Sequence, residues 1–308
     1  MHICPMKDDI VKICHLSDFH LPLPKEVPIS RLLGKRLLGW ANLTFKRSGT
    51  HKLKAFEALL EHLAAQDFDM VVVSGDLVNL ALSFEYSQVT ELFYKYGLVP
   101  ETTIVLPGNH DRYTPGAQSS GIFERAMKQW LPNGFSSRTG YPIVRSVGPV
   151  TIAAMDTAVW RGPLRAAGLV KTSSLKRLAK VVSRDDDRHL VVVTHHPPFR
   201  LEGSWNRHYR NGLSGYKKLV DLLCHRKCTL LHGHLHKLSR RQIGLMDVIG
   251  VPSASNVTGY LKSQLSYHVY TFDKSGLINA EAVVHWPDAV DKEHRFERRI
   301  IPGEILNV

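Results

Sequence analysis

Five short apolar runs in this 308-residue chain each stop at side chains of the kinds that bind metal ions. The runs are rich in Val, Ile and Leu, which is the pattern of buried strands. Helix-like segments separate them, and this alternation predicts βαβ units with a parallel sheet in an α/β fold. The runs, with the residues that end them, are 13–20, 70–76, 102–112, 190–196 and 229–236.

The ends of these five runs predict one shared metal site. In open α/β sheets the ligand crevice lies outside the carboxyl ends of the strands, so residues far apart in sequence can converge there. Carboxylate, amide and imidazole donors without thiolate suit Mn, Fe, Zn or Co. One open zinc-type catalytic ion keeps about three protein ligands, so a larger set predicts two ions about 3.5–4 Å apart. The candidate ligands are Asp18, His20, Asp76, Asn109, His195 or His196, His234 and His236.

Five short motifs follow one another in a fixed order. They are Asp-x-His at 18–20, Gly-Asp at 75–76, Gly-Asn-His-Asp at 108–111, His-His-Pro-Pro at 195–198 and Gly-His-x-His at 233–236. Each is weak alone, but the ordered set resembles the calcineurin-like metallophosphoesterase superfamily, across roughly residues 11–272. The resemblance implies a four-layer αββα sandwich of two mixed β-sheets flanked by helices. It also implies a dinuclear metal site at the C-terminal ends of the strands.

The resemblance gives each candidate ligand a role. His195 is preferred over His196 because the family ligand is the first residue after the strand in a His-x-Pro pattern. Two divalent ions are expected, Mn or Fe, with Zn and Co as alternatives. Asp18, His20 and His236 would hold one ion, Asn109, His195 and His234 the other, and Asp76 would bridge them.

Two such ions predict hydrolysis of a phosphoester or phosphoanhydride. A hydroxide that bridges the ions forms near neutral pH and attacks phosphorus in line. By resemblance His110 is the general acid, a contribution of about 10²–10⁴ in rate. The protein-phosphatase branch orients this histidine with an Asp at the position that Asn79 occupies here, which leaves Asp111 or another group as a possible orienter. We therefore expect His110 and Asp111 to act in catalysis, and Arg112 and Asn79 to contact the substrate.

A basic segment interrupts the α/β pattern at residues 21–50. Between Val27 and Phe56 there is no acidic residue, whereas seven Lys and Arg residues occur there. Apolar residues in its first half recur at the spacing of one helix face. A basic amphipathic segment is typical of a helix that lies on an anionic membrane or holds an acyl chain, here through residues 29–47. The alternative is a lid helix packed on the core.

Two partial resemblances bear on the substrate. The His-His-Pro-Pro and Gly-His-x-His motifs resemble the bacterial cyclic-nucleotide and glycerophosphodiester phosphodiesterases, which are the alternative prediction. The basic segment resembles the cap of hydrolases of lipid A synthesis, which split the pyrophosphate of UDP-2,3-diacylglucosamine. The principal prediction is hydrolysis of a phosphodiester or pyrophosphate, with a lipid-linked substrate at the membrane surface. Asn79 argues against a phosphomonoesterase, and nuclease or scaffold functions are less favoured still.

Charge and cysteine usage add constraints on partners and location. The net charge of +12 favours an anionic partner, here a phosphorylated small molecule or lipid-linked nucleotide. Nucleic acid is disfavoured because no capping domain is evident after residue 272. Four cysteines without a paired framework favour a reducing compartment. Without a signal-like N-terminus or a bilayer-length apolar run, we expect a cytoplasmic protein, peripheral at the plasma membrane if the basic segment binds lipid.

The expected organisation is one catalytic domain at residues 1–285 that contains the basic segment, followed by a charged C-terminal tail at 286–308. The tail is predicted from its composition, which is rich in Arg and Lys. The sequence does not predict an oligomeric state.

Overall fold

The computed structural model describes residues 10–21, 36, 53–137, 140–184, 186–203, 205–255, 265–287 and 294–303. These residues form two six-stranded sheets and a small two-stranded one. The first sheet has the order β14-β13-β12-β1-β2-β3, and the second has the order β10-β11-β9-β7-β5-β4.

The first sheet combines a parallel half with an antiparallel half. β1, β2 and β3 run parallel, and β12 pairs antiparallel with β1 and leads outward to β13 and β14. The strands are β1 (Val11–Leu16), β2 (Met70–Val73), β3 (Thr103–Val105), β12 (Leu265–Asp273), β13 (Gly276–Pro287) and β14 (His294–Ile300).

The second sheet has a parallel centre, β5-β7-β9-β11, with the antiparallel strands β4 and β10 at its edges. Its strands are β4 (Ile143–Val147), β5 (Val150–Ala154), β7 (His189–Val193), β9 (Cys228–His232), β10 (Ser239–Ile243) and β11 (Met246–Gly250). The small sheet pairs β6 (Gly168–Leu169) with β8 (Leu213–Ser214).

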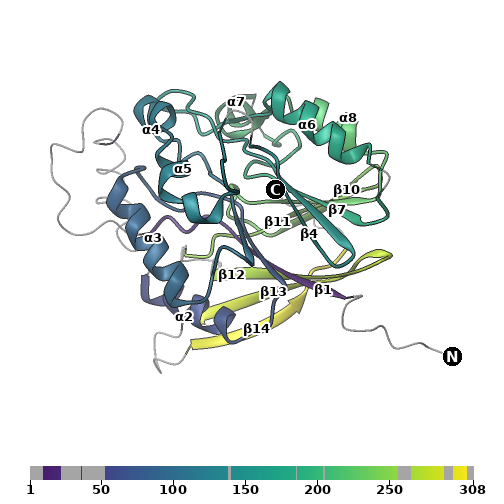
Figure 1. Ribbon diagram of the computed structural model, residues 1–308, viewed down its shortest axis with the longest axis horizontal. Coiled ribbons are helices and arrows are strands. Elements are labelled where there is room, and N and C mark those ends of the chain that lie inside the picture. Colours follow the sequence, from purple (N-terminus) through teal and green to yellow (C-terminus); the bar gives the residue numbers. More distant parts are fainter. Residues whose placement is uncertain are drawn as a thin grey trace.

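Helices cover the outer faces of both sheets, which makes four layers (Figure 1). α2 and α3 pack on the first sheet, and α6 and α8 pack on the second. The helices are α2 (Leu53–Ala64), α3 (Ser83–Lys95), α4 (Pro115–Ser120), α5 (Ile122–Ala126), α6 (Thr172–Val182), α7 (Trp205–Asn211) and α8 (Tyr216–Leu223), with a 3₁₀ turn at Lys128–Trp130. The predicted αββα sandwich of two mixed sheets is confirmed.

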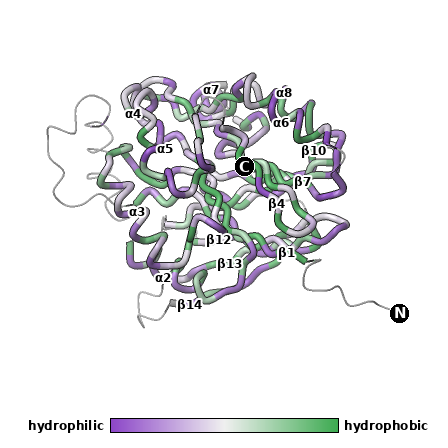
Figure 2. The backbone as a smooth tube through the Cα atoms, viewed as in Figure 1, coloured by the Kyte–Doolittle hydropathy of each residue, from purple (hydrophilic) through white to green (hydrophobic). Residues whose placement is uncertain are grey.

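The strands hold the layers together because both of their faces are apolar. In β2, Val71 and Val73 face the helices α2 and α3, whereas Val72 faces the second sheet. This division follows from the alternation of side chains along a strand. The hydrophobic colour in Figure 2 gathers accordingly on the strands between the helical layers. Such runs on both faces explain why the strands could be recognised in the sequence.

The prediction of a charged tail at 286–308 is wrong for the part that the structure describes. β13 extends to Pro287, and β14 pairs with it in register from Glu281 with Ile300 to Pro287 with His294. β14 is an edge strand with exposed Arg298 and Arg299. Charged residues are common on edge strands because they oppose pairing with other chains. The composition of β14 therefore resembles that of a charged tail.

The strands after residue 236 are divided between the two sheets. β10 and β11 extend the second sheet, whereas β12, β13 and β14 return to the first. The register of β12 against β1 places His268 beside His15.

The predicted basic segment at 21–50 lies outside the described residues except for Leu21 and Arg36. Its predicted helix and its membrane contact therefore remain predictions. Among the helices that the structure describes, none has the length and apolar character needed to cross a bilayer.

Candidate metal centre

The loops that follow β1, β2, β3, β7 and β9 bring the predicted ligands together. Asp76 lies at the middle of the group: its Oδ2 is 3.6 Å from His20 Nε2 and 3.4 Å from His195 Nε2. On one side, His236 Nε2 lies 3.2 Å from both His20 Nε2 and Asp18 Oδ1. Side chains from opposite ends of the chain therefore converge on one carboxylate, as the strand-end argument predicts.

The other side of the group is formed by Asn109, His195 and His234. Asn109 Oδ1 lies 3.3 Å from His195 Nε2. The ring centroids of His195 and His234 are 5.1 Å apart. All seven predicted ligand side chains thus lie in one cluster.

The backbone at this cluster is strained. Five residues have positive φ angles between 43° and 68°, a region that non-glycine residues rarely adopt. Such conformations persist only where contacts with the surrounding structure hold them in place, and they are concentrated at functional sites. The five are Asp18, His20, Asp76, His234 and His236, which are all predicted ligands.

Two glycines of the motifs allow the loops to approach this closely. A Cβ atom on Gly108 would collide with Asp76, and one on Gly233 would collide with Ser17 and Asp18. A side chain at either position would therefore push a predicted ligand out of place.

Each of the two carboxylates divides its oxygens between the protein and the site. Asp18 Oδ2 accepts a hydrogen bond from the His234 backbone N–H at 2.9 Å, and Asp76 Oδ1 accepts one from the His110 N–H at 2.7 Å. The other oxygens, Asp18 Oδ1 and Asp76 Oδ2, point toward the imidazoles. The backbone therefore fixes the orientation of both carboxylates, and one oxygen of each points into the cluster.

Main-chain carbonyls orient two of the imidazoles. His195 Nδ1 donates to Ser74 O and His234 Nε2 donates to Asn211 O, each at 2.9 Å. A carbonyl only accepts, so these bonds place the proton on Nδ1 of His195 and on Nε2 of His234. Holding one ring nitrogen in this way directs the other toward a metal.

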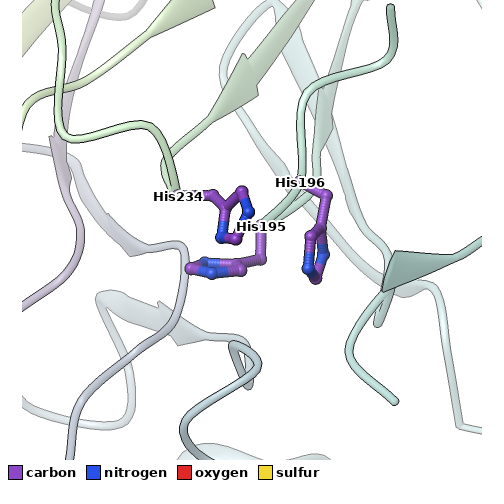
Figure 3. Close-up of side chains that lie close together, drawn as sticks. All are labelled: His195, His196 and His234. Atoms are coloured by element: carbon purple, nitrogen blue, oxygen red, sulfur yellow. The ribbon is translucent and has the colours of Figure 1, made fainter. Parts of the chain in front are cut away.

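His196 is bonded differently from its neighbours, although the rings of His195, His196 and His234 lie close together (Figure 3). His196 Nδ1 lies 2.9 Å from Thr157 Oγ1, and its Nε2 lies 2.8 Å from Ala166 O. Both of its ring nitrogens therefore have protein partners. This arrangement favours His195 over His196 as the ligand.

The charges in the cluster stabilise each other. Burial raises the pKa of the Asp18 carboxyl, but the His236 and His195 imidazoles outweigh this and hold the pKa below its usual range. The pKa of His195 is lowered by burial, yet Asp76 raises it to about 9. Asp18 is therefore an ionised carboxylate within a buried site, and it attracts cations.

The cluster fits the expected divalent ions. Asp18 Oδ1 is buried, and its near neighbours are imidazole nitrogens, with His236 Nε2 at 3.2 Å and His20 Nε2 at 3.9 Å. Such a group is costly to bury unless a cation neutralises it. Donor atoms of Asp18, His20 and His236 lie within 4.8 Å of one another, and so do those of Asp18, Asp76 and His195.

His110 lies at the edge of the cluster. Its ring contacts His20 edge to face, with centroids 4.6 Å apart, and stacks on Tyr113 at 5.3 Å. His110 Nδ1 donates to the main-chain carbonyl of Asn79 at 2.8 Å. The histidine is therefore oriented by the carbonyl oxygen of Asn79, and of the two alternatives left open by the sequence this is another group rather than Asp111.

The other three predicted substrate or catalytic residues face away from the cluster. Asp111 is buried, and its carboxylate accepts hydrogen bonds from Gly108 N, Leu77 N and the Tyr86 hydroxyl. Burial and the nearby Asp76 raise the pKa of Asp111 to about 7. Asp111 therefore fixes the turn that carries Asn109 and His110, and its place in the structure corrects the prediction of a catalytic role.

Arg112 is 3% exposed, and its guanidinium is paired with Glu124, 2.8 Å from Nη1, and with Asp156, 3.3 Å from Nη2. The Asn79 side chain is buried and donates to the Leu21 carbonyl. The prediction that Arg112 and the Asn79 side chain contact the substrate is therefore not supported, because both are already bound within the protein. Asn79 contributes its main-chain oxygen instead.

An open pocket of about 260 Å³ leads to the cluster. Ala166 and Leu235, which the sequence analysis did not single out, line it together with ligand side chains and His110. Ser74 and Asn211, which orient ligands, were also missed. These two act through main-chain carbonyls, which every residue type carries, so no sequence signal could have identified them.

Comparisons with known proteins agree with this geometry. The profile of the calcineurin-like phosphoesterases matches residues 11–238. A 3',5'-cyclic adenosine monophosphate phosphodiesterase, CpdA of Pseudomonas aeruginosa, is 24% identical over 262 residues, which cover 81% of this chain and 78% of that protein.

Solved structures share the fold at low sequence identity. A dimetal phosphatase from Danio rerio is 11% identical with a TM-score of 0.55, and the match covers 94% of this chain and 98% of that one. The purple acid phosphatase PPD1 of yellow lupin is 12% identical with a TM-score of 0.58, over 93% of this chain. This chain spans about half, 53%, of the length of the lupin enzyme. The profile match covers most of the chain, and the chain belongs to the calcineurin-like phosphoesterase family of metal-dependent phosphoester hydrolases.

Proposed function

We propose that this protein is a phosphodiesterase that uses two divalent transition-metal ions, Mn or Fe. The converging carboxylate and imidazole donors around Asp76 carry this proposal, because Asp76 contacts both halves of the cluster. Asp18, His20 and His236 hold one ion, Asn109, His195 and His234 hold the other, and Asp76 serves both. Two bound ions supply an activated water and neutralise charge on the phosphate.

The charge of the pocket favours a diester over a monoester. Among the described residues that line it, none is Lys or Arg. Arg112, which could have met a second phosphate charge, is paired with Glu124 and Asp156. A diester carries one negative charge fewer than a fully ionised monoester and needs less positive charge beyond the metal ions.

His110 is proposed as the group that protonates the leaving oxygen. It lines the pocket, and the hydrogen bond from Nδ1 to Asn79 O fixes its ring. The backbone N–H of His110 is bonded to Asp76, so its position is tied to the ligand cluster. A positioned general acid contributes about 10²–10⁴ in rate, and more where the leaving group is a poor one.

A cyclic nucleotide is the first substrate to test. The similarity to a cyclic adenosine monophosphate phosphodiesterase over most of both chains supports this choice. The pocket that would receive its phosphate has a volume of about 260 Å³ and is open to solvent.

A lipid-linked pyrophosphate is the second candidate. The absence of acidic residues between Val27 and Phe56, together with the net charge of +12, favours a substrate or surface that is both anionic and apolar. In this case the protein binds peripherally to an anionic membrane through residues 29–47.

A substrate comparison separates these candidates. Wild type and Asp76→Asn would be assayed with Mn on a cyclic nucleotide, bis-p-nitrophenyl phosphate, p-nitrophenyl phosphate and UDP-2,3-diacylglucosamine. We expect turnover of the diesters to exceed that of the monoester, and Asp76→Asn to abolish it. Preference for p-nitrophenyl phosphate would contradict the diesterase proposal, and preference for the acylated nucleotide would select the lipid candidate.

Membrane binding is tested separately from turnover. Wild type and Asp76→Asn should bind anionic vesicles equally, since the substitution leaves the basic segment intact. A deletion of residues 29–47 should lose that binding. If the deletion binds vesicles as well as wild type does, the membrane role of this segment is excluded.

A further inference from the structure

We propose that Arg36 is a positioning residue that holds His110 in place through a buried loop at residues 79–82. This inference rests on the proposed role of His110 as the general acid. Arg36 is the only residue between 22 and 52 that the structure describes.

The guanidinium of Arg36 holds two main-chain carbonyls of the 79–82 loop. Its Nε donates to Leu80 O and its Nη2 donates to Ala81 O, each at 3.1 Å. Leu80 and Ala81 are fully buried. The planar fork of an arginine can bond two oxygens at once, which a lysine cannot reproduce.

Glu85 holds the same loop from its amide side. Its carboxylate accepts hydrogen bonds from the backbone N–H groups of Asn79, Leu80 and Leu82, at distances from 2.8 to 3.2 Å. Burial raises the pKa of Glu85 to about 7, against the effect of these amides and of the Arg36 charge. Arg36 as donor and Glu85 as acceptor thus hold the peptide groups of one loop from both sides.

The loop is strained and needs such a clamp. Ala81 has a φ of 54°, in the left-handed region that residues with a Cβ atom rarely adopt. This conformation persists because the carbonyl of Ala81 and its neighbours are held by charged side chains. Loss of Arg36 removes the donors of two buried carbonyls, and the loop is then free to relax.

The same loop sets the orientation of His110. Asn79, at the first position of the loop, donates its backbone N–H to Glu85 and accepts a hydrogen bond from His110 Nδ1 at its carbonyl oxygen, at 2.8 Å. A shift of the loop therefore turns or releases the His110 ring without touching the metal ligands.

The test compares substrates that differ in their need for a general acid. Arg36→Ala, Arg36→Lys, His110→Ala and the double variant Arg36→Ala/His110→Ala would be assayed on an alkyl phosphodiester and on bis-p-nitrophenyl phosphate. Arg145→Ala is the matched control, because Arg145 also donates to two main-chain carbonyls, Pro100 O and Glu101 O, away from the pocket.

We expect Arg36→Ala to lower kcat on the alkyl ester by about 10–100-fold, the usual loss when a residue that orients a catalytic group is removed. KM for the alkyl ester should change little, and so should kcat on the aryl ester, bis-p-nitrophenyl phosphate. The double variant should be no slower than His110→Ala, and Arg36→Lys should recover part of the loss. In metal-free protein, the His110 ring ¹⁵N signals, assigned by their absence in His110→Ala, should shift in Arg36→Ala and stay in place in Arg145→Ala.

The outcomes separate the two proposals. If His110→Ala slows both esters equally, the general-acid role fails and the coupling fails with it. If His110→Ala is selective for the alkyl ester but Arg36→Ala behaves like Arg145→Ala, only the coupling is overturned. Arg36→Lys keeps the charge, so it serves the same comparison if Arg36→Ala does not fold.

Discussion

The imidazole of His195 donates a hydrogen bond from Nδ1 to the main-chain oxygen of Ser74, 2.9 Å away. This bond turns Nε2 toward Asp76 and Asn109, at 3.4 and 3.3 Å. His196 is next to it in sequence and equally buried, but both of its ring nitrogens are bonded to Thr157 and Ala166. Adjacent histidines therefore have different functions, one directed into the cluster and the other into the protein.

Replacement of His195 should lower the metal content, whereas replacement of His196 should lower the stability. His195→Ala is expected to lose one of the two proposed ions, measured as metal bound per chain. His196→Ala should keep both ions but lose about 1–3 kcal/mol of unfolding free energy, because Thr157 Oγ1 and Ala166 O lose a buried partner. Urea unfolding of the metal-free proteins gives the second quantity. Loss of metal in His196→Ala with full retention in His195→Ala would reverse the assignment.

Arg112→Ala should destabilise the protein without weakening substrate binding. The substitution leaves the buried Asp156 and the half-buried Glu124 without their guanidinium, and breaking one side of a buried ion pair typically costs about 3–5 kcal/mol. Lys171, which also pairs with Asp156, limits the loss on that side. The check is a comparison of unfolding free energy and KM between Arg112→Ala and wild type. A large rise in KM at unchanged stability would show that Arg112 contacts the substrate after all.

Removal of metal should lower stability as well as activity. Ions that bind only the folded state at about 100 times their Kd add about 2.7 kcal/mol for each site. Chelation should therefore lower the unfolding midpoint, and Mn or Fe should restore it. Mg should restore it poorly, because imidazole-rich sites favour transition metals. The control is the same chelation and metal addition with Asp76→Asn. If its unfolding midpoint responds as strongly as that of wild type, the ions bind elsewhere.

The sequence predicted the parts of this protein that depend on side-chain type. Val71, Val72 and Val73 read as a buried strand because both faces of the sheet are covered, and they do form β2. The ligands could be named because carboxylate and imidazole groups are recognisable wherever a strand ends, and the structure brings all seven together.

Contacts made by the backbone could not be predicted in this way. Asp111 and Arg112 follow His110 directly, but the turn directs both away from the pocket, toward Leu77 and Glu124. The partner of His110 is the main-chain carbonyl of Asn79, where the family resemblance led us to consider a carboxylate. β14 was mistaken for a tail because the charges of an exposed edge strand resemble those of an unstructured segment.

His189 lies outside the metal centre, on strand β7. Its Nε2 lies 3.0 Å from Thr229 Oγ1 and its ring packs on Phe272. Burial, with a smaller contribution from Arg226, lowers the pKa of His189 to about 4 from an ordinary value of 6.5. The unfolded chain therefore takes up this proton first as the pH falls. The stability that neutral His189 confers is complete above pH 6.5 and is lost progressively toward pH 4.

This change should amount to at most about 3 kcal/mol, at about 1.36 kcal/mol for each pKa unit, and less because the ring is partly exposed. His189→Gln should flatten the dependence of unfolding free energy on pH between 6.5 and 4 in metal-free protein. His225→Gln, at an exposed histidine, is the matched control and should leave the slope as in wild type. An unchanged slope in His189→Gln would mean that the buried ring accepts a proton in the folded protein as readily as in the unfolded one.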